Sequence, residues 1–327
     1  MTGYALPPTE PSHFAVAGIR ELLEAHHEAD IRDGERLAAA MKAARPDVVV
    51  HLAAQPIVRE GYRRPRETFD VNVIGTVGVL EAVRTLGRPC AVIAVTSDKC
   101  YENREQAAGY RETDPMGGHD PYSASKGAAE IVAASYRRSF FPAATRTRHG
   151  VQLATVRAGN VIGGGDWAPD RIVPDLVRHL AAGQAVPIRN PRAVRPWQHV
   201  LEPLSGCLDL AAKMLAAADA AWSAGWNFGP RTGDEATVAE LAQRFCAAWG
   251  SGRWIDAGDP HEPHEVGTLR LCIDKAMTEL GWRPRWNLAQ ALERTAAWYK
   301  RYGSEPAASM RPASLDDIRS YAQAAVA

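Results

Sequence analysis

Two short motifs in the middle of the sequence carry residues that could move protons and hydride. The first, Thr96-Ser97-Asp98-Lys99-Cys100-Tyr101, offers a hydroxyl, a carboxyl and an amine at consecutive positions. The second, Tyr122-Ser123-Ala124-Ser125-Lys126, places a phenol and an amine four residues apart, a spacing that puts both on one face of a helix. A nearby ammonium favours the phenolate and is expected to lower the pKa of Tyr122. Such a phenol can take a proton from a hydroxyl group while hydride leaves the same carbon.

The predicted elements around these motifs place both of them at the end of a parallel sheet. Residues 90–95 form an apolar run rich in β-branched side chains, which is typical of a buried parallel strand. The first motif follows directly, at the carboxyl end where open α/β sheets bind ligands. Pro121 suits the first turn of a predicted helix over 121–141. Tyr-x-x-x-Lys alone is usually an ordinary helix surface, and the preceding strand with Thr-Ser-Asp-Lys is what favours a catalytic site.

Strands and helices alternate over the first half of the chain. The pattern predicts strands at 2–6, 47–54, 90–95 and 152–157, and helices at 33–44, 65–86 and 121–141. With right-handed crossovers, this order gives a Rossmann-like, doubly wound parallel α/β sheet over 1–160. Beyond that point the alternation loosens and prolines multiply. Residues 161–327 are therefore expected to form mainly a smaller substrate-binding lobe, with some segments returning to the first domain.

Composition excludes several classes of partner. The 327 residues include 38 Lys and Arg and 38 Asp and Glu, without the basic block that a nucleic-acid surface needs. No apolar run approaches the roughly twenty residues that span a membrane. The 5 cysteines are scattered without a C-x-x-C pair, which favours reduced thiols and a cytoplasmic location. No metal site is expected, because Pro263 in the run 261–265 would break the helix that an H-E-x-x-H motif requires.

With both motifs in their predicted places, the sequence resembles the extended short-chain dehydrogenase/reductases that modify nucleotide sugars, over essentially the whole chain from Gly3. Most 4,6-dehydratases of this branch carry Thr-Asp-Glu after the strand, whereas this chain carries Ser97-Asp98-Lys99. That departure, with the long motifs at 157–167 and 195–204, is similar to the CDP-glucose 4,6-dehydratases. The resemblance implies a hydro-lyase that converts CDP-D-glucose to CDP-4-dehydro-6-deoxy-D-glucose with bound NAD.

The resemblance also implies roles for individual residues. Tyr122, held by Lys126, would take the 4-hydroxyl proton beside Ser97, Asp98 would protonate the departing 6-hydroxyl, and Lys99 would act as the C5 base. The last role requires a lowered Lys99 pKa. The expected cofactor contacts are Asp30, Ile31, Arg32, Ala53, Ala54, Gln55, Asn72, Tyr122, Lys126 and Arg157. The expected contacts with the substrate are Asn160, Arg171, Arg195, Trp197 and His199.

Helices 65–86 and 121–141 are expected to form a homodimer interface, as in relatives, with packing inside one subunit as the alternative. Another nucleotide-sugar enzyme, such as a 4-epimerase, is the enzymatic alternative to a dehydratase. Asp98 argues against it, because an epimerase needs no acid for elimination at C6.

One expected feature is missing from the sequence, namely a glycine-rich turn of the form G-x-x-G-x-x-G or G-x-G-x-x-G. Gly75-Thr-Val-Gly78 lies within a predicted helix, and Gly163-Gly164-Gly165 has the wrong spacing. Relative to the family the chain begins about one strand–helix unit late, so strands 2–6 and 47–54 should flank an unpaired lane in the sheet. Either the start codon is internal to a longer gene, which the intact catalytic motifs favour, or the protein is a non-catalytic remnant with little NAD affinity.

Overall fold

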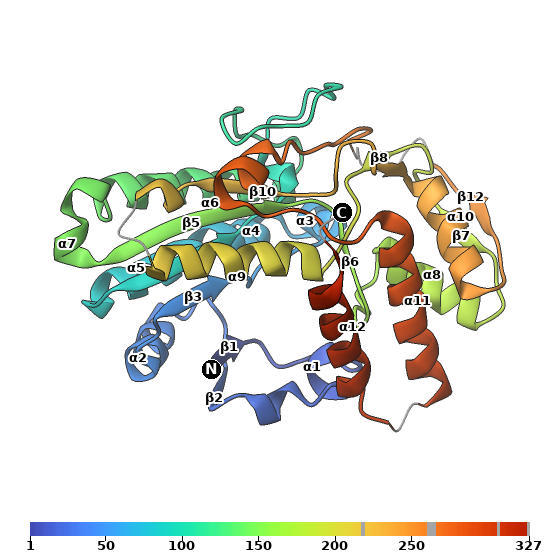
Figure 1. Ribbon diagram of the computed structural model, residues 1–327, viewed down its shortest axis with the longest axis horizontal. Coiled ribbons are helices and arrows are strands. Elements are labelled where there is room, and N and C mark those ends of the chain that lie inside the picture. Colours follow the sequence, from blue (N-terminus) through green and yellow to red (C-terminus); the bar gives the residue numbers. More distant parts are fainter. Residues whose placement is uncertain (217–219, 260–265, 306–307, 326–327) are drawn as a thin grey trace.

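The computed structural model describes residues 1–216, 220–259, 266–305 and 308–325 (Figure 1). Its central layer is a parallel sheet with the strand order β10-β5-β4-β3. The strands are β3 (Val48–His51), β4 (Cys90–Val95), β5 (Val151–Ala158) and β10 (Gly225–Phe228). Nearly every residue of β4 and β5 is buried, as expected for strands covered by helices on both faces. The predicted doubly wound α/β fold is confirmed.

Alternation along β4 divides the core into two layers. Val92 and Ala94 pack against the helices of one face, whereas Ala91 and Ile93 pack against those of the other. The helices of the first face are α2 (Gly34–Ala44), α5 (Gly75–Leu86) and α6 (Pro121–Ser139). The second face is covered by α9 (Leu201–Ala216) and the π-helix Ala276–Leu280. Three segments from the second half of the chain, α9, β10 and the π-helix Ala276–Leu280, thus belong to the Rossmann-like layers.

Strands β1 (Thr2–Ala5) and β2 (Ala25–Glu28) form a separate parallel pair. Figure 1 shows this pair set apart from the four-stranded sheet. Among the described residues, β1 pairs only with β2 and β3 pairs only with β4, so the expected break in the sheet is present. Val50 in β3 and Leu52 just after it are 42% and 56% exposed. We call these two unpaired flanks the open edges of β1 and β3.

The prediction of one continuous helix over 65–86 is wrong, because the α-helix is interrupted in the middle of this range. It consists of α4 (Pro65–Phe69), a π-helix (Asp70–Ile74) and α5. The Asn72 side chain in the wide turn accepts a hydrogen bond from Gln55 N (2.8 Å) and donates to Gln55 O (3.1 Å) and Ser125 Oγ (2.8 Å). Asn72 therefore ties the loop after β3 to α6. Single π-turns of this kind are frequent near functional sites.

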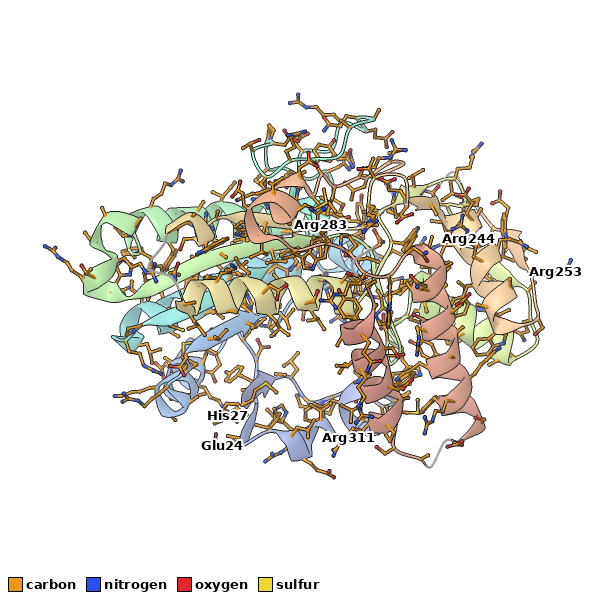
Figure 2. All side chains as sticks on the ribbon, viewed as in Figure 1. Glu24, His27, Arg244, Arg253, Arg283 and Arg311 are labelled. Atoms are coloured by element: carbon orange, nitrogen blue, oxygen red, sulfur yellow. The ribbon has the colours of Figure 1, made fainter. Side chains whose placement is uncertain are left out.

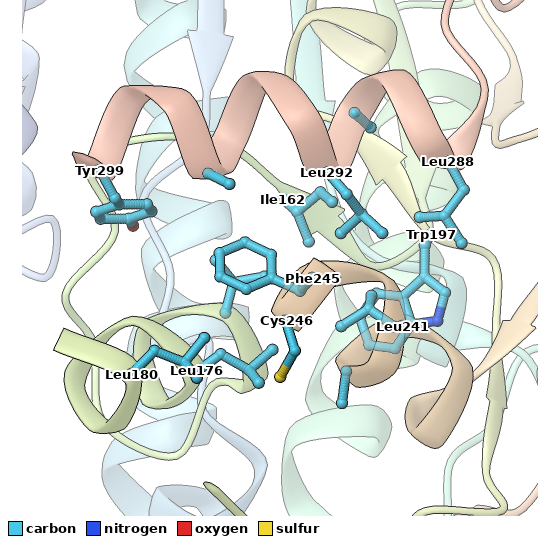
Figure 3. Close-up of a cluster of buried hydrophobic side chains, with 14 of the residues drawn as sticks. Ile162, Leu176, Leu180, Trp197, Leu241, Phe245, Cys246, Leu288, Leu292 and Tyr299 are labelled. Carbon is cyan, nitrogen blue, oxygen red and sulfur yellow. The ribbon is translucent and has the colours of Figure 1, made fainter. Parts of the chain in front are cut away.

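The lobe, made from most of residues 161–325, has its own hydrophobic core (Figure 3). Figure 3 shows Leu292 of α11 on the side of Phe245 of α10 and Leu176 of α8, and Leu288 beside Trp197. The lobe's helices are α8 (Ile172–Ala181), α10 (Val238–Trp249), α11 (Leu288–Ser304) and α12 (Arg311–Gln323). Its short strands are β6 (Val161–Ile162), β7 (Val186–Ile188), β8 (Val194–Arg195), β9 (Gln198–His199), β11 (Ala236–Thr237) and β12 (Trp254–Asp256).

Short elements complete the chain and join its ends to the lobe. Arg311 of α12 donates to the carbonyls of Ala17 and Gly18, just after α1 (Figure 2). The short helices are α1 (His13–Val16), α3 (Val58–Arg63), α7 (Arg146–His149), and 3₁₀ turns at Ile19–Leu22, Asp98–Cys100, Ala143–Thr145 and Ala220–Trp222.

Neither a membrane span nor a metal centre is found in the part of the chain that the structure describes. No described helix is both long and apolar enough to cross a bilayer. The described residues hold no group of three or more His, Cys, Asp or Glu side chains arranged for a metal ion. The polar run from His261 to Glu265 lies outside the described residues.

Candidate active site

A cavity of about 1020 Å³ lies where the carboxyl ends of β4 and β5 meet the lobe. The first motif and the start of α6 line one part of it, and the loops after β5, β6 and β7 line another. The predicted catalytic and substrate-binding residues in its wall are Ser97, Asp98, Lys99, Tyr122, Asn160, Arg171, Arg195 and Trp197. Residues that are up to a hundred positions apart in the sequence therefore line the same cavity.

The chain direction after β4 explains how the first motif enters the cavity. The strand ends at Val95, and Ser97 then caps a single 3₁₀ turn by accepting a hydrogen bond from Lys99 N (3.2 Å). The Ser97 hydroxyl also donates to Asp98 Oδ1 at 3.1 Å. This tight turn presents three consecutive polar side chains at the end of the sheet.

Asp98 is the most strongly perturbed carboxyl in the cavity wall. It is 3% exposed, and its Oδ2 atom is buried without a hydrogen-bond partner. Burial raises the pKa of Asp98 to about 6, although the Lys99 charge and the Ser97 hydrogen bond act to lower it. A carboxyl with a pKa close to neutrality can hold a proton and donate it, which suits a general acid.

Tyr122 and Lys126 are buried at the start of α6, where Asp120 caps the helix by accepting from Ser123 N. Burial raises the pKa of Tyr122 to about 12, outweighing a hydrogen bond with Ser97 and the charge of Arg171. The expectation of a lowered Tyr122 pKa is therefore wrong, because the effect of burial exceeds the charge effects. Burial also lowers the pKa of Lys126 to about 8.

Some of the residues predicted to contact a dinucleotide follow strands β2 and β3, and others, such as Lys126, are buried in α6. Asp30–Arg32 follow β2, and Ala53–Gln55 follow β3, so both segments lie at the carboxyl edge of their strands. The buried ammonium of Lys126 makes one long hydrogen bond, to Val95 O at 3.4 Å, and so has donors left for ribose hydroxyls. This donor set fits the nicotinamide–ribose end of a dinucleotide. No described residues form a glycine-rich turn after β1.

Arg157 belongs to a buried network beneath the cavity rather than to its wall. Its Nε and Nη2 donate to Glu130 at 3.0 and 2.8 Å, and its Nη1 donates to Tyr101 Oη (2.8 Å) and Glu112 O (3.1 Å). Glu130 also accepts from Thr96 Oγ1 at 2.6 Å. The predicted contact between Arg157 and the cofactor thus gives way to a positioning role, because every guanidinium nitrogen is already engaged.

Glu130 was missed by the sequence analysis, although a signal for it was present. It lies four residues after Lys126 and eight after Tyr122, so all three share one stripe of α6. That spacing points a carboxylate at the base of the first motif, where Thr96 is held.

The predicted substrate residues differ in how available they are. Arg195 donates to the carbonyls of Val194, Val266 and Gly267, so its guanidinium ties β8 to the segment 266–267 as well as lining the cavity. Trp197 packs in the lobe core and donates to Ala236 O.

His199 and Arg171 lie at the two extremes of exposure. His199 is 2% exposed and outside the cavity wall, and burial lowers its pKa to about 4. The prediction that His199 faces the substrate is therefore not matched by its position. Arg171 has a 36% exposed side chain, 3.7 Å from Asp166, and is more accessible than Arg195, Trp197 and His199, which are buried.

Comparison with known proteins connects this arrangement to nucleotide-sugar dehydratases. The sequence model of the family described as GDP-mannose 4,6 dehydratase matches residues 12–295. A CDP-glucose 4,6-dehydratase from Salmonella typhimurium is 51% identical over 302 residues, which cover 92% of this chain and 83% of that protein. A dTDP-glucose 4,6-dehydratase from Streptomyces antibioticus is 31% identical over 274 residues, which cover 83% of this chain and 75% of the relative.

Solved structures match the fold at lower identity. The crystal structure of a dTDP-glucose 4,6-dehydratase from Bacillus anthracis in complex with NAD has a TM-score of 0.74 at 21% identity, covering 93% of this chain and 88% of that chain. A UDP-glucose 4-epimerase from Thermus thermophilus in complex with NAD has a TM-score of 0.73 at 22% identity, covering 92% and 99%. Since dehydratases and an epimerase match equally well, the fold alone does not separate the two activities.

Proposed function

The chain belongs to the GDP-mannose 4,6 dehydratase family, and from that premise we propose that it is an NAD-dependent hydro-lyase that converts CDP-D-glucose to CDP-4-dehydro-6-deoxy-D-glucose. The choice of substrate is supported by the 51% identity with a CDP-glucose 4,6-dehydratase. The structural observation that carries the proposal is the meeting of Ser97, Asp98, Lys99 and Tyr122 in one cavity wall.

The nicotinamide end of the cofactor, where hydride transfer occurs, would have a suitable binding site. When bound, NAD accepts hydride from C4 of the sugar and returns it to C6. The buried Lys126 ammonium makes one long hydrogen bond, to Val95 O, so it has further N–H donors with which it would hold the nicotinamide ribose. The segments Asp30–Arg32 and Ala53–Gln55 would hold the rest of the molecule along the strand ends, with Asn72 fixing the position of Gln55.

The residues of the cavity wall can supply each proton transfer of the dehydration. Tyr122, whose pKa is raised by burial, takes the proton of the 4-hydroxyl, which Ser97 orients. The phenolate that this requires would be stabilised by Lys126, four residues further along the same helix face. Once C4 is a ketone, the C5 hydrogen is acidic; Lys99 would remove it as a proton and give a proton back to C5 when hydride adds to C6. Asp98 gives its proton to the 6-hydroxyl, so that the oxygen leaves as water.

The proposed reaction is tested by product analysis. Purified protein is incubated with CDP-D-glucose and NAD, and the products are examined by mass spectrometry and NMR. We expect the loss of one water and a 4-keto-6-deoxy sugar. A product of unchanged mass with inverted C4 would show an epimerase instead. UDP-glucose, dTDP-glucose and GDP-mannose serve as matched substrates, and faster turnover of any of them would overturn the choice of CDP-D-glucose.

Asp98 gives the reaction a predictable pH dependence. Its acid form is lost as pH rises through about 6, so turnover limited by elimination should fall about tenfold per pH unit above that value. The raised pKa also contributes stability that is present below 3.8 and lost as pH rises through about 6. Asp98→Asn should therefore abolish water loss yet unfold at pH 8 with a free energy about 2–3 kcal/mol higher than the wild type.

The measurements for Asp98 are a pH profile of turnover and denaturant unfolding at pH 8 and pH 5. In deuterated water, Asp98→Asn should still exchange the C5 hydrogen of the substrate, because C4 oxidation does not need this carboxyl. Water loss at the wild-type rate in Asp98→Asn would remove Asp98 from the role of acid.

Lys99 is the expected base, and its removal separates two halves of the reaction. Lys99→Ala should lower turnover about 10²-fold or more, the usual contribution of a positioned general base. C5 exchange in deuterated water should fall in parallel, while the affinity for CDP stays the same. The matched control is Lys300→Ala, whose ammonium bonds Ala248 O on the outer side of α11. Unchanged turnover in Lys99→Ala would rule out this role.

The assembly and location of the enzyme are also part of the proposal. We place a homodimer contact on α5 and α6, supported by exposed apolar side chains at Ile74, Ile131 and Phe140 on or beside these helices. Each of the 5 cysteines is a free thiol, which supports a reducing, cytoplasmic setting.

A further inference from the structure

One of the acidic side chains in the cavity wall, Asp170, lies among several arginines. Asp170 Oδ1 accepts a hydrogen bond from Arg189 Nη1 at 2.6 Å, and Arg59 Nε lies 3.9 Å from the same oxygen. Arg63 Nη1 lies 3.8 Å from the other carboxylate oxygen. Arg59 and Arg63 belong to α3, whereas Arg189 follows β7 in the lobe. The Asp170 carboxylate therefore links the two halves of the protein across the site.

Asp170 is held in an unusual backbone conformation. Its φ angle is +61°, in the left-handed region that few residues other than glycine adopt. Burial acts to raise its pKa, but the Arg189 hydrogen bond and the charges of Arg189, Arg59 and Arg63 lower it overall. The carboxylate is therefore ionised at neutral pH and serves as the counter-ion of these arginines.

The cluster carries more positive charge than Asp170 can neutralise. Asp170 faces three guanidiniums, of which Arg63 also lies 3.5 Å from Glu60. Arg171 lies in the wall of the same cavity, 3.7 Å from Asp166. Guanidinium groups match the geometry of phosphate oxygens, which they can bind through two parallel hydrogen bonds. The diphosphate of a nucleotide sugar has the charge and the shape that this cluster lacks.

We propose that Asp170 is an internal stand-in for the substrate diphosphate. In the empty enzyme it holds Arg59 and Arg189 in place, and the diphosphate takes over both guanidiniums when the substrate binds. The proposal rests on the proposed function, since it assumes a nucleoside diphosphate sugar as ligand. Asp170 then acts as a positioning residue that preforms the subsite and also weakens binding, because its hydrogen bond with Arg189 must break first.

If the diphosphate replaces the Asp170 carboxylate at these arginines, substitutions of Asp170 and of Arg189 should change the affinity for CDP in opposite directions. Asp170→Asn should bind CDP about tenfold more tightly than the wild type, because no carboxylate competes with the diphosphate. Asp170→Gly should do the same, and its glycine suits the positive φ angle, so the fold is maintained. Arg189→Gln should bind CDP about tenfold more weakly. The affinity for cytidine, which has no phosphate, should be the same in all variants.

Calorimetric titration of cytidine, CMP and CDP into each variant tests the exchange, together with KM and kcat for CDP-D-glucose. KM should fall in both Asp170 variants, whereas a merely structural role would raise it or leave it unchanged. The matched control is Asp175→Asn, which lines the same cavity but pairs with Arg178 of its own helix.

The outcomes separate this inference from the proposed function. If the wild type binds CDP and neither Asp170 variant binds it more tightly, the exchange is overturned while the proposed function stands. If the wild type binds none of CDP, UDP, GDP and dTDP, both are overturned. Equal tightening in Asp175→Asn would show a general charge effect and would also overturn the specific role of Asp170.

Discussion

Replacing Tyr122 with phenylalanine should lower turnover of CDP-D-glucose by about 10²–10⁴-fold, the usual contribution of a positioned acid–base group. The ring is 8% exposed and stays in place, so the substitution removes only the hydroxyl that shares a hydrogen bond with Ser97. Because no other phenol lines the cavity wall described above, no described residue can replace it. Steady-state kcat and the calorimetric affinity for CDP are the measurements, and the affinity should not change.

The matched control for this substitution is Tyr136→Phe on the same helix. The Tyr136 hydroxyl donates to Glu81 at 2.6 Å, outside the cavity, so its loss should leave turnover unaffected. A decrease of only a few-fold in Tyr122→Phe would assign the proton transfer to another group.

The largest effect on stability is expected from Glu130→Ala. Glu130 and Arg157 are 4% and 7% exposed at the side chain, and the substitution leaves the guanidinium buried without its counter-charge. Breaking a buried pair in this way costs about 3–5 kcal/mol of unfolding free energy. Turnover should fall as well, since Thr96 loses its bond to Glu130 at the base of the catalytic turn. Denaturant unfolding followed by tryptophan fluorescence gives the free energy.

An exposed ion pair supplies the comparison for Glu130. Arg111 and Asp274 lie 3.4 Å apart with side chains 65% and 59% exposed, so Arg111→Ala should change stability far less. The double substitution Glu130→Gln with Arg157→Met should recover part of the loss, because it removes the unpaired charge. Equal effects of Glu130→Ala and Arg111→Ala would contradict the buried-pair account.

The sequence predicted those parts of the fold that local patterns control. The apolar run 90–95 became β4, and the proline at 121 begins α6, so both catalytic motifs were placed correctly at the sheet edge. The unpaired lane beside β1 and β3 was expected from the resemblance to the family, in which a further strand and a glycine-rich turn come first. In contrast, the π-turn at Asn72 depends on contacts with Gln55 and Ser125, which are distant in the sequence.

Site properties that depend on burial could not be predicted in the same way. The pKa of Tyr122 is set by how fully the surrounding chain removes water, and no local pattern measures that. Arg157 resembled a cofactor ligand by its motif, but its partner Glu130 comes from another element. The proposed role of Asp170 depends on the contact of α3 and the loop after β7 with this side chain in three dimensions. The sequence of neither segment alone predicts that contact.

The open edges of β1 and β3 have a consequence for how molecules meet in solution. An unpaired strand edge is a template on which a strand from another molecule can continue the sheet. Residues 48–51 of β3 include no proline, lysine or acidic residue of the kind that usually blocks such templating. Wherever these edges stay unpaired, backbone bonding there would link molecules end to end into growing assemblies, which a closed twofold contact between helices would not produce. Particle size that rises continuously with concentration would distinguish this polymerisation from a dimer.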